Sequence, residues 1–206
     1  MNWKRWSHLD PRSLAIMRIC TGLLILMDLA GRFRCLKDHY TDQGILPCSM
    51  ARALSESGPW TFCVHTLSGT IQFQMFLFGL AALAAVALLV GWRTQWVTLL
   101  SWFLLLSLHH RNRFLNDGGD YELRMLLFWA IFLPWGARWS VDSRSTRSYP
   151  VAPLAATAYM LQIASIYLVT GLHKLTPFWL DGSAIFRSLS LINFQGPLGA
   201  FAASLF

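Results

Sequence analysis

Residues 71–92 have the sequence IQFQMFLFGLAALAAVALLVGW, an apolar run interrupted only by Gln72 and Gln74 near its start. A helix needs about 20 apolar residues to cross about 30 Å of hydrocarbon, and this run is long enough. The whole chain has a matching composition, because 55% of its residues are hydrophobic, 13% are charged and the mean hydropathy is +0.44. A soluble domain carries about 25% charged residues. The sequence therefore predicts an integral membrane protein built from α-helices.

Further apolar runs lie on both sides of this one, at residues 13–30, 95–110, 121–135 and 151–173. A last run, 189–206, contains Asn193 and Pro197, and its apolar end is too short to span a bilayer. We expect an all-α fold, a polytopic transmembrane helix bundle with five complete spans and a partial sixth. Residues 1–206 are expected to form a single transmembrane domain that is shortened at its C-terminus.

The chain is basic, with a net charge of +7 and a pI of about 9.7. No run of Lys and Arg lies on a polar domain that could hold a duplex, so we expect no nucleic-acid partner. Basic loops beside anionic lipid headgroups account for the charge, and the lipid bilayer is the expected partner. Lys4, Arg5 and Arg12 precede the first span and favour a cytoplasmic N-terminus in a multi-pass protein of the plasma membrane.

Ionisable residues inside spans are costly and are therefore candidates for function. The first span contains Arg18 and Asp28, and helical steps of three and four residues place both on one face with Arg32. Asp28 and Arg32 are spaced i,i+4, which suits an ion pair. Two interpretations stay open: a buried pair that fixes helix packing, or a polar group that faces a substrate.

A second polar cluster is the segment 116–124, NDGGDYELR, in which Gly118 and Gly119 mark a turn. Asp117 or Asp120 can cap the helix that follows, and Asp120 and Arg124 are again spaced i,i+4. A helix cap with a salt bridge is one interpretation of this cluster, and a functional site that includes Asn116 is the other.

The fifth apolar run ends in a third cluster, Tyr167, His173 and Lys174, with Lys174 seven residues after Tyr167 on the same helical face. A lysine at a helix end commonly reaches toward the headgroups. The alternative is a desolvated lysine that loses its proton near neutral pH and acts as a base.

We expect no metal site. His109 and His110 have no carboxylate or Cys partner at metal-ligand spacing, and the four cysteines form no C-x-x-C pair.

Four segments together resemble the HTTM (horizontally transferred transmembrane) domain family, which includes the vitamin K-dependent gamma-carboxylases. They occur in family order: residues 39–47 (HYTDQGILP), 116–124 (NDGGDYELR), 134–142 (PWGARWSVD) and 166–175 (IYLVTGLHKL), the last followed by Trp179 and Asp181-Gly182. The first segment adds Tyr40 and Asp42 to the candidate site residues. We expect the large C-terminal domain with which the carboxylases bind propeptide and substrate to be missing.

The resemblance implies chemistry that uses a reduced, vitamin K-like quinone as cofactor. In the carboxylases a lysine deprotonates the quinol, and the oxygenated quinol becomes a base that removes a γ-proton from peptide glutamate before CO2 adds. Lys174 matches that lysine, and Asp120 stands where the carboxylases have an assisting histidine. Lys174 and Asp120 are therefore the candidate catalytic residues, with a secreted peptide or protein as substrate.

The resemblance leaves open whether the chain is an enzyme. One alternative is an accessory membrane factor for the maturation or export of a secreted peptide, similar to the sporulation-delaying protein system. Another is a structural membrane subunit whose buried ions serve packing alone.

Overall fold

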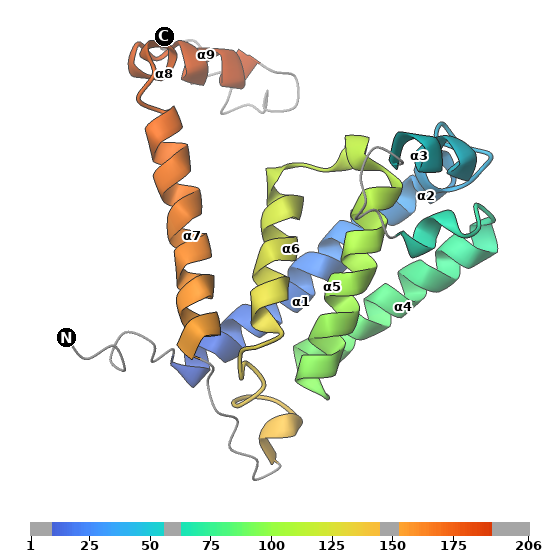
Figure 1. Ribbon diagram of the computed structural model, residues 1–206, viewed down its shortest axis with the longest axis horizontal. Helices are drawn as coiled ribbons and strands as arrows, with labels where there is room; N and C mark the ends of the chain where they lie inside the picture. Colours follow the sequence, from blue (N-terminus) through green and yellow to red (C-terminus); the bar gives the residue numbers. More distant parts are fainter. Residues whose placement is uncertain (1–9, 56–62, 145–152, 191–206) are drawn as a thin grey trace. The chain divides into compact units, whose positions relative to one another are not determined.

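The computed structural model describes residues 10–55, 63–144 and 153–190 (Figure 1). Within these ranges every regular element is helical and no strand occurs, so the all-α prediction is confirmed. The chain divides into two compact units, residues 1–159 and 160–206, and each is described by itself.

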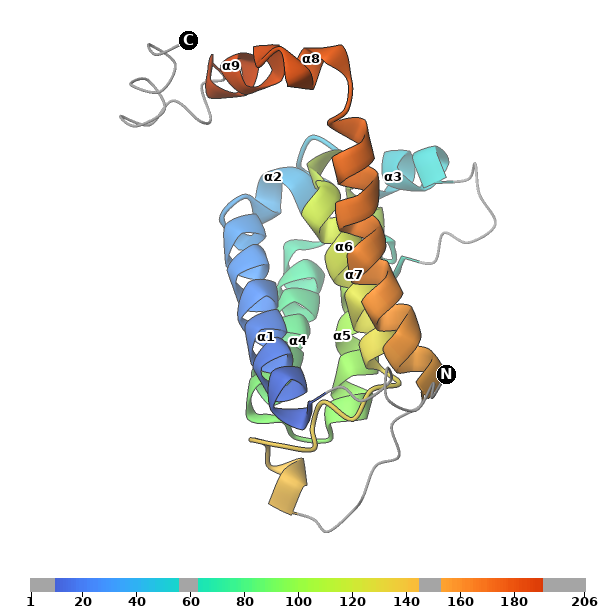
Figure 2. The ribbon, with the colours of Figure 1, turned by 90° about the vertical axis from the view of Figure 1, so that its left-hand side faces the viewer.

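The first unit is a bundle of four longer helices with short elements at one end. Its longer helices are α1 (Pro11–Arg34), α4 (Ile71–Val90), α5 (Thr94–Arg111) and α6 (Gly118–Ala130), and its shorter elements are α2 (Leu36–Tyr40), α3 (Cys48–Ser55) and the 3-10 turns η2 (Val64–Thr66), η3 (Arg113–Leu115) and η4 (Asp142–Arg144). Helix α1 packs on α4, α4 on α5, and α5 on α6, as Figures 1 and 2 both show. Consecutive long helices therefore run side by side; the α4–α5 and α5–α6 connections are short, whereas residues 35–70, with α2, α3 and η2, join α1 to α4.

Small side chains allow α1 and α4 to approach closely. A Cβ atom added to Gly22 would lie 2.9 Å from the Leu89 side chain and 3.1 Å from the Ala85 carbonyl oxygen. Ala81, Ala84 and Ala85 are buried on α4. Helices in lipid associate through packing rather than through the hydrophobic effect, so small residues at the contact favour this pairing.

The turn between α4 and α5 is held by Asp142. Gly91 ends α4 with φ of 70°, a left-handed conformation that glycine adopts at low cost. The Asp142 carboxylate then accepts from the backbone N–H of Arg93 (2.9 Å) and of Thr94 (2.7 Å). This carboxylate satisfies N–H groups at the start of α5 that have no partner within the helix.

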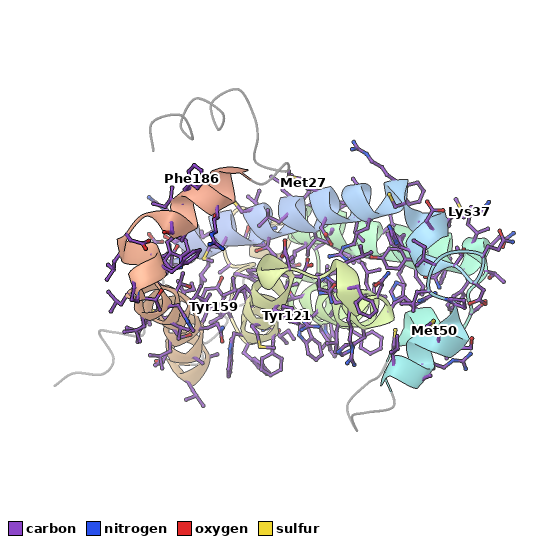
Figure 3. The ribbon with its side chains drawn as sticks, turned by 90° about the horizontal axis from the view of Figure 1, so that it is seen from above. Met27, Lys37, Met50, Tyr121, Tyr159 and Phe186 are labelled. Carbon is purple, nitrogen blue, oxygen red and sulfur yellow. The ribbon has the colours of Figure 1, made fainter. Side chains whose placement is uncertain are left out.

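The outer faces of the helices are apolar. Met27 of α1, Met50 of α3 and Tyr121 of α6 are exposed and are labelled in Figure 3. Large apolar side chains are also exposed along α4, including Phe76 and Leu83. A soluble protein rarely exposes so much contiguous apolar surface, and lipid chains account for it.

The second unit holds most of α7 (Pro153–His173), whose first turns belong to the first unit, and two short helices. These are α8 (Pro177–Leu180) and α9 (Ser183–Ser190). Leu161, Leu168 and Leu172 are exposed along α7, as expected for a helix in contact with lipid.

The prediction of five complete spans is wrong for the described residues: three helices, α1, α4 and α7, are long and apolar enough to cross a membrane. Helix α6 has 13 residues; at 1.5 Å per residue it is about 20 Å long and falls short of the hydrocarbon thickness. Helix α5 has 18 residues but buries polar side chains, among them Thr98, Ser101 and Ser107, inside the bundle. The partial sixth span was expected at 189–206, which lies almost entirely outside the described residues.

Candidate functional site

Arg32, near the C-terminal end of α1, is the centre of a polar cluster. Its Nε donates to both carboxylate oxygens of Asp28 (2.8 and 2.9 Å), one helical turn earlier. Its Nη2 donates to Asp120 Oδ2 of α6 at 2.7 Å, and its Nη1 to the Tyr40 hydroxyl of α2 at 3.1 Å. One guanidinium thus joins three helices, and the predicted Asp28–Arg32 pair is confirmed as part of a larger network.

The start of α6 positions Asp120. Asp117 is the N-cap residue, and its side chain accepts from Asp120 N (3.0 Å), while Asp120 Oδ2 accepts from Asp117 N (3.0 Å). This reciprocal capping box confirms the predicted cap and fixes the Asp120 rotamer. The expected Asp120–Arg124 ion pair does not occur among the described contacts. Arg124 instead stacks over the Tyr121 ring, with 4.9 Å from Cζ to the centroid.

His109, in the last turn of α5, lies beside this network. Its side chain is completely buried, and its Nε2 is 3.5 Å from Asp120 Oδ1. The Asn116 side-chain amide donates to the His109 backbone carbonyl at 2.8 Å, which ties the loop before α6 to the end of α5. Neither ring nitrogen of His109 has a hydrogen-bond partner in the described part of the chain.

A cavity of about 320 Å³ opens beside the cluster. Asp28, Arg32, Tyr40 and Asp120 line it, with further lining from Gly31, Cys35, His39, Leu115 and Asp117. Burial raises the pKa of the Tyr40 hydroxyl, although the Arg32 guanidinium acts in the opposite direction. Tyr40 therefore carries its proton at neutral pH and can donate as well as accept a hydrogen bond.

Asp42 is not among the residues that line this cavity. Its Oδ1 accepts from Cys48 N at 2.7 Å, at the start of α3. This hydrogen bond holds the pKa of the exposed Asp42 carboxyl below its usual value. The contact orders the loop between α2 and α3.

Arg18 lies about 15 Å from Asp28 along α1, since ten residues separate them. It is fully buried and donates to the carbonyl oxygens of Leu88, Leu89, Trp135 and Trp139. Sequence reasoning placed Arg18 and Asp28 in one polar face, and the structure assigns them to different contacts near opposite ends of the helix.

Lys174 belongs to the second unit, directly after α7. Its Nζ lies 5.2 Å from the centroid of the Trp179 ring. Tyr167, His173 and Lys174 are all exposed within the described chain. Leu172, Leu175 and Phe178 lie within four residues of Lys174 in the sequence and are exposed apolar side chains.

The model of the HTTM domain family matches residues 6–202. The chain belongs to the HTTM domain family. The match covers all the polar clusters described above, in both units, and confirms the family expected from the four segments. No curated protein and no solved structure matches this HTTM chain.

Two site residues of this HTTM domain are more important in the structure than the sequence indicated. The sequence alone pairs Arg32 only with its i,i+4 partner, and it shows no carboxylate partner for His109 at metal-ligand spacing. The partner of both, Asp120, is 88 residues from Arg32 in sequence, so no local spacing could show the contact. One signal for His109 was present in the sequence. This histidine ends a long apolar run directly before a polar loop, at a helix end that can meet neighbouring helices.

Proposed function

We propose that this HTTM protein is a membrane enzyme that uses a reduced lipid quinone, with Lys174 as the base. The observation that supports the proposal most is that the family match includes the segment around Lys174. The described helices also support a location in the bilayer, where a lipid quinone is dissolved.

The surroundings of Lys174 fit such a cofactor. The amine lies over the face of Trp179, and the exposed apolar residues Leu175 and Phe178 follow Lys174 in the sequence. Trp179, Leu175 and Phe178 are the apolar side chains that would hold a quinone ring near Lys174. When bound, a reduced quinone would supply electrons to O2 and would itself be oxidised. Lys174, which is exposed in the described chain, would accept the proton of the quinol hydroxyl at Nζ once the bound quinone and the lipid exclude water from the amine.

Turnover by the purified protein in lipid nanodiscs tests this proposal. Oxidation of a reduced vitamin K analogue under O2, followed by chromatography, is expected to depend on the wild-type protein. Lys174→Met should abolish turnover while the quinone still raises the thermal unfolding temperature. Lys37→Met is the matched control, because Lys37 is an exposed lysine in the other unit (Figure 3). Equal turnover by wild type and Lys174→Met would refute the assigned base.

A structural role in the membrane is the second candidate. It is favoured by the Asp28–Arg32–Asp120 network, in which each of the three guanidinium nitrogens donates to a protein group. Under this alternative, Asp120→Asn lowers the unfolding temperature but no ligand changes it. A thermal shift on adding quinone would exclude the purely structural candidate.

The outcome of the quinol-oxidation assay decides how the two remaining expectations are tested. These are a peptide substrate and a role as an accessory factor for a secreted peptide. If the protein oxidises quinol, adding glutamate-containing peptides with labelled bicarbonate tests for carboxylation. If it does not, co-purification with a secreted peptide from the same cells becomes the informative experiment.

A further inference from the structure

Three potential metal ligands from three different helices converge beside the cavity. Asp28 of α1, His109 of α5 and Asp120 of α6 each place one ligand atom so that all three lie within 4.8 Å of one another. Asp28 precedes His109 by 81 residues, and Asp120 lies on the helix after that of His109, so the packing of the helices creates this group.

The imidazole of His109 provides an independent indication of a ligand. The side chain is completely buried, and both ring nitrogens lack a hydrogen-bond partner among the described residues. Buried polar atoms without a partner are rare in folded proteins. At 3.5 Å, Nε2 and Asp120 Oδ1 are too far apart for a good hydrogen bond. Two ligands of a tetrahedral metal with bonds of about 2.0–2.1 Å are about 3.3–3.4 Å apart, which this separation nearly matches.

The hydrogen bonds of Arg32 leave Asp120 Oδ1 and lone pairs of the Asp28 carboxylate available to bind a metal ion. Its Nη2 and the Asp117 N–H both use Oδ2 of Asp120, so Oδ1 is directed at His109 without a hydrogen bond from either. Its Nε contacts Asp28, whose oxygens each keep a second lone pair. Carboxylates that bind metals are commonly held in this way by outer hydrogen-bond donors.

The charge of the cavity also suits a cation. Three carboxylates (Asp28, Asp117 and Asp120) and one guanidinium (Arg32) line it, which leaves two negative charges uncompensated among these groups when His39 is neutral. In a partly buried site next to lipid, uncompensated charge is costly. A divalent cation would neutralise it.

We propose that this protein binds one divalent transition-metal ion between His109 Nε2, Asp120 Oδ1 and a carboxylate oxygen of Asp28. One nitrogen and two oxygen ligands suit zinc, manganese or ferrous iron. Three protein ligands leave a further coordination position for water or a substrate oxygen, as in catalytic metal sites. Arg32 and Tyr40 form the outer layer that orients the two carboxylates.

Metal titration of the purified protein, without any quinone, tests this site. The protein is prepared with a tag that contains no histidine, treated with chelator, and titrated with Zn²⁺ and Mn²⁺. Elemental analysis after gel filtration should find one ion per chain. His109→Gln and Asp120→Asn should weaken binding by more than about 100-fold, which is the loss that even an outer-layer partner can cause. His173→Gln, an exposed histidine in the second unit, should bind as the wild type does.

Two measurements keep the test decisive if a variant folds poorly. Thermal unfolding in chelator shows which variants are folded without metal, and Co²⁺ added to the wild type should give the absorption bands of a low-symmetry site with a nitrogen ligand. Wild-type protein that retains no metal, or folded His109→Gln that binds it equally well, would overturn the proposal. Either result leaves the quinone assay untouched, because that assay depends on Lys174 and a different ligand.

Discussion

Replacing Arg18 with Met should be among the most damaging single changes in the first unit. Arg18 donates to Leu89 O (2.7 Å), Trp139 O (2.6 Å) and Trp135 O (3.2 Å), and also to Leu88 O. These bonds fasten α1 to the C-terminal end of α4 and to the segment after α6. Methionine has a similar length but no donor.

The loss in free energy of unfolding can be worked out from the carbonyl oxygens that Arg18→Met leaves without its donors. A buried carbonyl that loses its only donor costs about 1–3 kcal/mol. Trp135 is buried, whereas Leu89 and Trp139 are partly accessible and are discounted. Removing a buried charge recovers part of its desolvation cost. The Leu88 carbonyl keeps a bond from the Gly91 N–H (3.2 Å), whereas the described contacts give the other three carbonyls no other backbone donor, so the loss should still dominate, at about 2–4 kcal/mol.

Unfolding in detergent micelles on titration with sodium dodecyl sulfate measures this free energy. Arg34→Met is the matched control, because Arg34 is an exposed arginine on the same helix. Arg18→Lys should fall between wild type and Arg18→Met, since one ammonium cannot reach four carbonyls. If Arg18→Met costs no more than Arg34→Met, the clamp contributes nothing and the reasoning is refuted.

Three further predictions use the same unfolding assay. Burial lowers the pKa of His65 to about 3, whereas in the unfolded chain this histidine binds a proton near pH 6.5. The free energy of unfolding should therefore be unaffected by His65 above pH 6.5 and should fall by about 1.4 kcal/mol per pH unit between pH 6.5 and pH 3. His65→Asn should show a flatter dependence on pH. Asp142→Ala removes the acceptor for two N–H groups at the start of α5 and should cost about 1–2 kcal/mol. Asp142→Asn should cost less, because Oδ1 and Oδ2 each accept one of these bonds and the single amide oxygen can keep one of them. Gly22→Ala should destabilise, because the new Cβ meets Leu89, whereas Gly79→Ala, where nothing lies within 4 Å, should be neutral or stabilise by up to about 1 kcal/mol.

Local patterns in the sequence predicted the helices and their ends well. The run at 71–92 forms α4 and the turn at Gly91, and the segment around Asp117 forms the predicted cap of α6. Apolar composition was a poorer guide to spans. Helix α5 is apolar enough to look like a span, but polar side chains such as Thr98 and Ser107 find their partners inside the bundle, and Thr98 donates to the Thr94 carbonyl.

The site was only half predictable, for a physical reason. The i,i+4 rule finds Asp28 and Arg32 because a helix fixes their separation. It cannot find Asp120, because that contact depends on how α1 and α6 pack in three dimensions. The same limit hid His109, whose carboxylate neighbours come from other helices.

Two arginines of α1, Arg18 and Arg32, show why function is to be sought at one end of the helix. Arg18 meets only backbone carbonyls, which have fixed positions, carry no net charge and cannot titrate. Arg32 meets two carboxylates and a phenol, all of which line a cavity. A cation or a hydrogen-bonding ligand can compete for carboxylates that a guanidinium shares between two helices, whereas it gains little from carbonyls at a packed helix end. The Arg32 cluster is therefore the place in the first unit where binding a ligand can change the contacts between helices.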